Sequence, residues 1–409
     1  MTILSWGSRR HAFVIRTSSF VFLSVLDLQQ LRQQFADFNA YQSREQARLK
    51  DKLRQALEAL SECGPRWQDL QQAQPRPQRW LVAGLRDDPT RRYPPRERPT
   101  PITVVATDGS QIYPDRHVEP HCYLLNISRI AFQYGTFERP LMESVPRFEY
   151  RREAFDEAFD QLLGTATADV VSALRDEFEL AALFDLARQA RIPGRPLLAL
   201  ADGTLIRWML RGLRNHALEQ QLTDRYTRHL ADFQAEGIPF CSYISMPGNT
   251  EVVNLLRVHR GESDDTDPAA SLAGVQDRWL FERTLAPGER SAVFESASHI
   301  QDDYPTDSRV CYFYVHVAAR QGGVEVGRVE VPRWVADDPG LLDLVHATVL
   351  SECEKGEGYP MILAEAHERA VIRARERDLF YDMIDREMSA AGLSHTGSRK
   401  QASKRRPRV

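Results

Sequence analysis

The segment at residues 102–117, ITVVATDGSQIYPDRH, constrains the fold more than any other stretch of this chain. Residues 102–106 are apolar and rich in β-branched side chains, which predicts a buried strand. Asp108 and Gly109 follow, and because glycine adopts turn conformations that other residues avoid, we expect the strand to end there. The Asp108 carboxylate would then point into a cleft at the end of a core strand.

A second copy of this pattern occurs at residues 197–205, LLALADGTL, where Asp202 follows another apolar run. Two carboxylates at the ends of two strands in one domain could converge on one cation or phosphate. The alternative is that both are ordinary Asp-Gly turns. The two patterns alone leave both interpretations open.

Two further carboxylates, Glu177 and Glu179, lie on a helix predicted at residues 168–191, just before the second Asp-Gly element. This order lets three carboxylates gather at one end of a sheet, where they repel one another unless cations bind. Hard oxygen ligands suit Mn²⁺ or Mg²⁺, and two such ions can assist phosphodiester hydrolysis. Because the sequence does not fix the helix phase, Glu179 is our choice for the helical ligand and Glu177 the reserve.

His367 lies on a final helix predicted at residues 361–390. The tripeptide at residues 358–360, Gly-Tyr-Pro, precedes this helix and would set its start. An imidazole beside a metal cluster could stabilise the scissile phosphate or transfer protons. The alternative is a structural histidine that packs against its own domain.

Composition restricts the class of protein. The 409 residues include five scattered cysteines without a CxxC pair, which argues against a disulfide framework or a zinc knuckle and favours the reducing cytoplasm. The net charge of −4 requires that any nucleic-acid partner contact a local basic patch. No apolar run is long enough to span a membrane, and the short one at residues 18–26 is assigned to an N-terminal extension.

The chain order predicts an α/β protein with five regions. They are an extension at 1–25, a long helix or helical hairpin at 26–64, a proline-rich connector at 65–101, the main domain at 102–390 and a basic disordered tail at 391–409.

Within the main domain we expect further elements from periodicity and turn residues. They are strands at 122–134, 148–151 and 239–245, helices at 213–236, 277–285 and 341–354, a polar surface loop at 259–275, and a β-hairpin formed by 310–319 and 324–331. The strands at 102–106 and 122–134 should pair antiparallel because their connection is short.

Several segments together resemble the NurA family of DNA-end-processing nucleases in its bacterial form. They are VATDGSQIYPDRH, YLLNISRIAFQYG, LALADGTL, CSYISMPGNTEVVNLLR, GERSAVF, FYVHVAARQGGVEVGRVEVPRWV and GYPMILAEAHERAVI, and they span about residues 100–385. The resemblance implies a ribonuclease H-like mixed-sheet core flanked by helices. It also implies a Mn²⁺- or Mg²⁺-dependent deoxyribonuclease with 5′ to 3′ exonuclease and single-strand endonuclease activity.

The resemblance further implies a homodimer that works on single- and double-stranded DNA ends with a HerA-type hexameric ATPase in double-strand break repair. Asp108, Asp202 and His367 match catalytic positions of the family, and Glu179 or Glu177 matches the helical glutamate. Asp277 resembles a further acidic position and is expected as a fourth metal ligand. Archaeal members often have a lysine after the YIS-like strand, where this chain has Ser-Met-Pro at 245–247.

Two other classes of protein share parts of this pattern. Actin-like and sugar-kinase ATPases also hold phosphates with strand-end Asp-Gly-Ser/Thr elements, but no Gly-Gly-rich adenosine segment occurs between residues 205 and 300. A non-catalytic clamp for DNA ends or for a translocase would not need a cluster of carboxylates, which is costly to maintain. Both remain alternatives to the nuclease.

Overall fold

The computed structural model describes residues 28–72, 79–114, 122–150, 168–213, 216–263, 265–268, 270–318 and 323–393. The predicted extension at 1–25 and nearly all of the basic tail at 391–409 lie outside these ranges. The chain divides into two compact units, Met1–Lys50 and Asp51–Val409. Of the two N-terminal alternatives, the structure contains the single long helix, α1 (Leu28–Cys63).

Eleven strands in the described part of the chain form one mixed sheet, in the order β1-β9-β10-β11-β7-β6-β3-β4-β5 with β2 and β8 attached beside β10. The centre consists of β3 (Ile102–Ile112), β4 (Tyr123–Tyr134), β5 (Leu141–Glu149), β6 (Leu197–Asp202) and β7 (Phe240–Ile244). β3, β4 and β5 are antiparallel neighbours, whereas β6 runs parallel to both β3 and β7. This confirms the expected ribonuclease H-like mixed-sheet core.

The predicted β-hairpin is present as β10 (Val310–Ala318) and β11 (Val324–Pro332), paired antiparallel over their full lengths. β11 joins the central strands by antiparallel pairing with β7. The residues between α1 and β3 differ from the irregular connector that we expected. They contribute β1 (Gly84–Leu85) and β2 (Arg92–Tyr93), which pair with β9 (Phe294–Glu295) and β8 (Arg290–Ser291). Prolines flank these strands because proline is tolerated at sheet edges.

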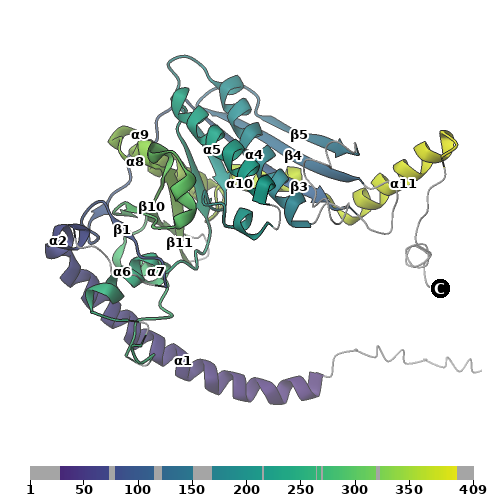
Figure 1. Ribbon diagram of the computed structural model, residues 1–409. Helices are drawn as coiled ribbons and strands as arrows, with labels where there is room; N and C mark the ends of the chain where they lie inside the picture. Colours follow the sequence, from purple (N-terminus) through teal and green to yellow (C-terminus); the bar gives the residue numbers. More distant parts are fainter. Residues whose placement is uncertain are drawn as a thin grey trace, which may run out of the picture. The chain divides into compact units, whose positions relative to one another are not determined.

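Helices cover both faces of the sheet. α4 (Ala168–Ala190) and α5 (His216–Ala235) lie side by side (Figure 1) and pack on the face that carries Val105 and Ala199. The opposite face carries Ala106 and Leu200 and packs against α8 (Arg333–Ala336), α9 (Pro339–Lys355) and α10 (Met361–Ala370). Because successive side chains of a strand point to opposite faces, alternate residues of β3 pack into two separate hydrophobic cores.

The remaining helices of the described residues are α2 (Trp67–Gln72), α6 (Glu251–His259), α7 (Asp277–Thr284) and α11 (Ala374–Ala390), with short 3₁₀ helices η1 (Gly64–Arg66), η2 (Trp208–Gly212), η3 (His299–Asp303) and η4 (Thr306–Ser308). The predicted final helix is therefore two helices, interrupted between Ala370 and Ala374. No helix among the described residues is both long and apolar enough to span a membrane.

The described residues between 260 and 275 form a loop, as expected, but it is not a simple polar surface loop. Leu272 and Val275 are fully buried, and the buried Glu262 accepts hydrogen bonds from Arg257 and the backbone N–H of Leu272. Lys52 of α1 donates to two carbonyl groups of this loop, at Pro268 and Ala273. The backbone polar groups are thus paired inside the protein, which is the condition for burying a loop.

Candidate active site

Asp108 lies within a strand and not at its end. β3 continues through the Asp-Gly-Ser sequence to Ile112, and each of these residues has a partner on β4, with Asp108 opposite Ser128. Gly109 has no positive φ and does not form a turn. Our prediction of a strand end at this point was therefore wrong, because pairing with β4 extends the strand beyond its apolar run.

Asp108 and Asp202 lie on the same face of two neighbouring strands. β3 and β6 are parallel, and Ala106 lies opposite Leu200. Asp108 and Asp202 each follow two residues later, so the same register places them opposite each other. Both follow the alternation that places Ala106 and Leu200 toward α9 and α10. The parallel pairing thus brings together carboxylates that are almost a hundred residues apart in sequence.

Gly109 makes room for Glu179 on the opposite face of β3. A Cβ atom at Gly109 would lie 2.5 Å from Glu179 Oε1 and 2.9 Å from Arg175 Cγ. The hydroxyl of the neighbouring Thr107 donates to the Glu179 backbone carbonyl at 2.9 Å, which fixes α4 along the strand. The function of this glycine is therefore close approach of a side chain.

We expect Gly109→Ala to displace the Glu179 carboxylate and to slow any reaction that depends on it by about 10²-fold, because misplacement of about 1 Å has that effect. Overpacking should lower the free energy of unfolding by about 1–3 kcal/mol. Single-turnover cleavage and thermal melting measure the two effects. Gly248→Ala is the matched control, since a Cβ there has its nearest neighbour only at 4.0 Å. A wild-type rate for Gly109→Ala would contradict this assignment.

Of the two candidate glutamates, only Glu179 approaches Asp108. Glu177 is buried on another side of α4, where its Oε1 lies 3.3 Å from His229 Nε2 of α5. Residues two positions apart on a helix cannot share a face. The helix phase that the sequence left open is thus set by the packing of α4 on β3 and α5.

Asp202 ends β6, and Gly203 follows with a φ of +78°, so the second Asp-Gly element is a turn. Gly203 N–H donates to the Tyr243 carbonyl, and the Tyr359 hydroxyl donates to Asp202 Oδ1 at 2.9 Å. Buried Glu330 of β11 accepts hydrogen bonds from Thr204 Oγ1 at 2.9 Å and from the next backbone N–H at 2.8 Å. Hydrogen bonds to β7, to β11 and to Tyr359 therefore fix this turn.

His367 reaches the same face from α10. Its Nδ1 lies 3.0 Å from Asp108 Oδ2, and 65% of its side chain is exposed. The last carbonyl of α10, that of Ala370, accepts hydrogen bonds from Ser110 of β3 and from Asn126 of β4, the latter at 2.9 Å. Both donors belong to the strand pair that carries Asp108, so the histidine and the aspartate are positioned by one local unit.

Burial and neighbouring charges raise the pKa values of two carboxylates at the site. Burial raises the pKa of Glu179 well above its ordinary value, and the charges of Asp176 and Asp108 raise it further. Desolvation by the surrounding protein also raises the pKa of Asp202, to which Asp108 again contributes. Burial is the largest cause of both shifts, and the like charge of Asp108 adds to each.

The donor types, carboxylate oxygens with one imidazole, suit a hard divalent cation such as Mn²⁺ or Mg²⁺. The buried Glu179 Oε1 accepts no hydrogen bond, and its contact at 2.9 Å is the ion pair with Arg175 Nε. Among the described residues, the side chains as placed do not bring three His, Cys, Asp or Glu groups around one point. The chemistry of the donors fits a metal, and Glu179 is held by a cation of the protein itself, Arg175.

Sequence reasoning missed two groups at this site. Arg175 lies one turn before Glu179 on α4, with its Nε 2.9 Å from Glu179 Oε1. Tyr359 belongs to the turn before α10, and its hydroxyl also donates to Asp202 Oδ1. The i,i+4 spacing of Arg175 and Glu179 was a usable signal for their pairing.

The family assignment agrees with this geometry. A family model described as the NurA domain matches residues 102–372, from the first residue of β3 to just beyond α10. The chain belongs to the NurA family. The NurA domain thus contains every residue of the site described above.

Two solved structures are similar to this NurA-family chain. The crystal structure of the NurA nuclease from Sulfolobus solfataricus is 12% identical and covers 73% of this chain and 88% of that chain, with a TM-score of 0.46. The crystal structure of LC9-RNase H1, a type 1 RNase H with the type 2 active-site motif, is 12% identical and covers 40% of this chain and 72% of that chain, with a TM-score of 0.22. No curated protein matches the chain.

Asp277, expected as a fourth metal ligand in this NurA domain, has a structural position instead. It is fully buried, and its oxygens accept hydrogen bonds from the first backbone N–H groups of α6, those of Val252 and Val253, and from the Tyr314 hydroxyl. The unpaired N–H groups at a helix start are a preferred partner for a carboxylate. Asp277 therefore caps α6 from a distant part of the chain.

Burial raises the pKa of Asp277 from its ordinary value of 3.8 to about 7. Because the pKa is higher in the folded state, the stability linked to this proton is fully present below about pH 3.8 and is lost as the pH rises through about 7. We expect Asp277→Asn to remove this pH dependence. Asp277→Ala should lower the free energy of unfolding at pH 5 by about 1–2 kcal/mol, because the cap is lost. Denaturant unfolding between pH 4.5 and 8 measures both. A loss of metal binding in a folded variant would contradict the capping role.

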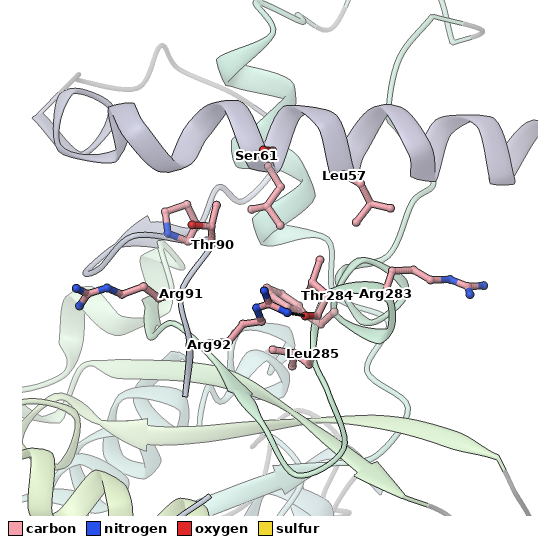
Figure 2. A pocket seen from close by; sticks show the side chains of 11 residues that line it. Leu57, Ser61, Thr90, Arg91, Arg92, Arg283, Thr284 and Leu285 are labelled. Atoms are coloured by element: carbon pink, nitrogen blue, oxygen red, sulfur yellow. Dashed lines mark hydrogen bonds between the residues drawn. The ribbon is translucent and has the colours of Figure 1, made fainter. Parts of the chain in front are cut away.

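A cavity of about 330 Å³ lies elsewhere in the unit that contains the NurA domain. Figure 2 shows it below the end of α1, between Leu57 and Ser61 of that helix, Thr90 and Arg92, and the end of α7 at Thr284. Arg92 is held there by a hydrogen bond to the Thr284 carbonyl at 3.0 Å. None of the site residues lines this cavity.

Proposed function

We propose that this NurA-family protein is a metal-dependent DNA nuclease that processes DNA ends, with 5′ to 3′ exonuclease activity and with endonuclease activity on single strands. Membership of the family supports a nuclease. The observation that carries the proposal is the convergence of Asp108, Asp202 and His367 on one face of β3 and β6, with Glu179 against Gly109 of the same strand.

Asp108, Glu179 and Asp202 would hold Mn²⁺ or Mg²⁺. When bound, such ions activate water and neutralise the charge that develops on the phosphate. Tyr359 donates to Asp202 Oδ1 and so restricts the orientation of that carboxylate. His367 places Nδ1 against Asp108, which leaves Nε2 as the nitrogen that can donate to, or accept a proton from, the DNA.

The decisive experiment uses single- and double-stranded DNA labelled at either the 5′ or the 3′ end, incubated with Mn²⁺, with Mg²⁺ or with EDTA. We expect metal-dependent cleavage, with mononucleotides or short oligonucleotides released first from 5′-labelled ends. If the protein binds DNA but does not cleave it with either Mn²⁺ or Mg²⁺, the non-catalytic clamp would be favoured. Stabilisation by ATP in the absence of DNA would favour the ATPase.

We further propose that the protein acts as a cytoplasmic homodimer with a HerA-type hexameric ATPase. The first part of α1 supports a protein contact, because Phe35, Phe38 and Tyr41 are about half exposed along it. All five cysteines are free and buried, in keeping with a reducing compartment. Sedimentation at micromolar concentration tests the dimer, and co-sedimentation with the ATPase tests the complex.

A further inference from the structure

Arg175 places a positive charge among the carboxylates of the site. Its Nε and Nη2 both donate to Asp176 Oδ1, at 3.2 Å and 2.6 Å. The same Nε also lies 2.9 Å from Glu179 Oε1, with which it forms an ion pair. Its Nη1 donates to Gln111 Oε1 of β3 at 3.3 Å. The guanidinium thus links α4 to the strand that carries Asp108, and all three of its nitrogens face an acceptor.

The absence of a side chain at Gly109 makes this arrangement possible. The Arg175 stem and the Glu179 carboxylate both lie against the glycine, at 2.9 Å and 2.5 Å from the position of a Cβ atom. Arg175 is partly buried, with 27% of its side chain exposed. It is therefore part of the packed site and not a surface arginine that happens to contact an acid.

Acidic side chains outnumber basic ones around Arg175. Asp108, Asp176 and Glu179 are the acids, and Arg175 and Arg207 are the bases, with Arg207 Nη1 at 3.6 Å from Asp176 Oδ2. Asp176 is shared between the two arginines. Glu179, by contrast, has Arg175 as its ion-pair partner among the described residues. A divalent ion that binds Glu179 would therefore have to displace the guanidinium.

We propose that Arg175 is a built-in counter-ion that holds Glu179 in the metal-free protein and competes with the divalent ion for that carboxylate. The inference rests on the proposed metal-dependent function. The observation behind it is the ion pair of Arg175 Nε with Glu179 Oε1 at 2.9 Å. A planar guanidinium is suited to this task because its separate nitrogens reach Glu179, Asp176 and Gln111, whereas an ammonium group presents its three donors from a single atom.

The test is calorimetric titration of Mn²⁺ into the metal-free full-length protein without DNA, together with melting temperatures in EDTA and in Mn²⁺. We use Arg175→Met, which retains an apolar stem over Gly109 and removes the charge. The variant should bind Mn²⁺ about tenfold more tightly, because a nearby like charge is removed. It should melt at a lower temperature than wild type in EDTA and gain more from Mn²⁺.

Arg188→Met is the matched control, since Arg188 is a more exposed arginine of the same helix, with 55% of its side chain exposed. It should leave Mn²⁺ affinity unchanged. Arg175→Lys retains the positive charge but not the planar guanidinium. Its Mn²⁺ affinity should lie between those of wild type and Arg175→Met. It also serves as the variant to titrate if Arg175→Met does not fold, and tighter Mn²⁺ binding than wild type is then the expected result.

Unchanged or weaker Mn²⁺ binding by the folded Arg175 variants would overturn the inference and would make Arg175 a residue that positions Glu179 for the metal. The proposed function fails in a different way. If wild type cleaves DNA only with Mn²⁺ or Mg²⁺ while the variants bind no more tightly, the counter-ion role alone is wrong. If wild type binds neither ion and cleaves nothing, both proposals are wrong.

Discussion

Asp108→Ala should abolish DNA cleavage, with a loss of about 10³-fold or more, because each lost 1.4 kcal/mol of transition-state stabilisation is about tenfold in rate. Asp108 occupies the centre of the site: His367 contacts it directly, and its charge raises the pKa values of Glu179 and Asp202. Single-turnover cleavage at saturating Mn²⁺ is the measurement.

The same substitution should spare the fold. The strand continues on both sides of Asp108, and removal of one carboxylate relieves repulsion on Glu179 and Asp202. We therefore expect the metal-free melting temperature to stay the same or to rise. DNA affinity should change little, because cationic contacts to phosphates dominate it. Asp185→Ala, an exposed acid on α4, is the control for loss of one negative charge. A normal rate in a metal-replete preparation of Asp108→Ala would remove Asp108 from the reaction.

His367→Ala should slow the chemical step by roughly 10²–10⁴-fold, the usual range for general acid-base or electrostatic assistance. The side chain is 65% exposed, so its truncation removes little packing. The catalytic and structural interpretations thus predict opposite results in one preparation. A catalytic histidine gives a slow enzyme of normal melting temperature, whereas a structural histidine gives a normal rate per folded molecule and a lower melting temperature.

Metal binding provides the second measurement for His367. Mn²⁺ titration should give nearly the wild-type affinity, since Asp108, Glu179 and Asp202 remain in place. His299→Ala is a suitable control, since His299 is almost fully exposed on η3. A strong loss of Mn²⁺ affinity would instead make His367 a metal ligand.

Local sequence patterns were sufficient for most strands and helices. The apolar runs that precede Asp108 and Asp202 form neighbouring parallel strands, and the hairpin of β10 and β11 follows its turn and its β-branched residues. These elements are predictable because their apolar residues recur with the period of a strand or of a helix. The candidates Asp108, Asp202 and His367 could be named for the same reason, since each has a position relative to such an element.

The sequence by itself determined the residue types of the site and the strands that bring the two aspartates together. Only the tertiary structure decided which other groups join them. Pairing with β4 extends β3 through Gly109. Packing on α5 directs Glu177 toward His229 and not toward Asp108, and Asp277 binds the N-terminus of α6. Each of these outcomes depends on a hydrogen bond or a close contact with a distant part of the chain. Such contacts leave no periodic trace in the local sequence, whereas buried strands and helices do.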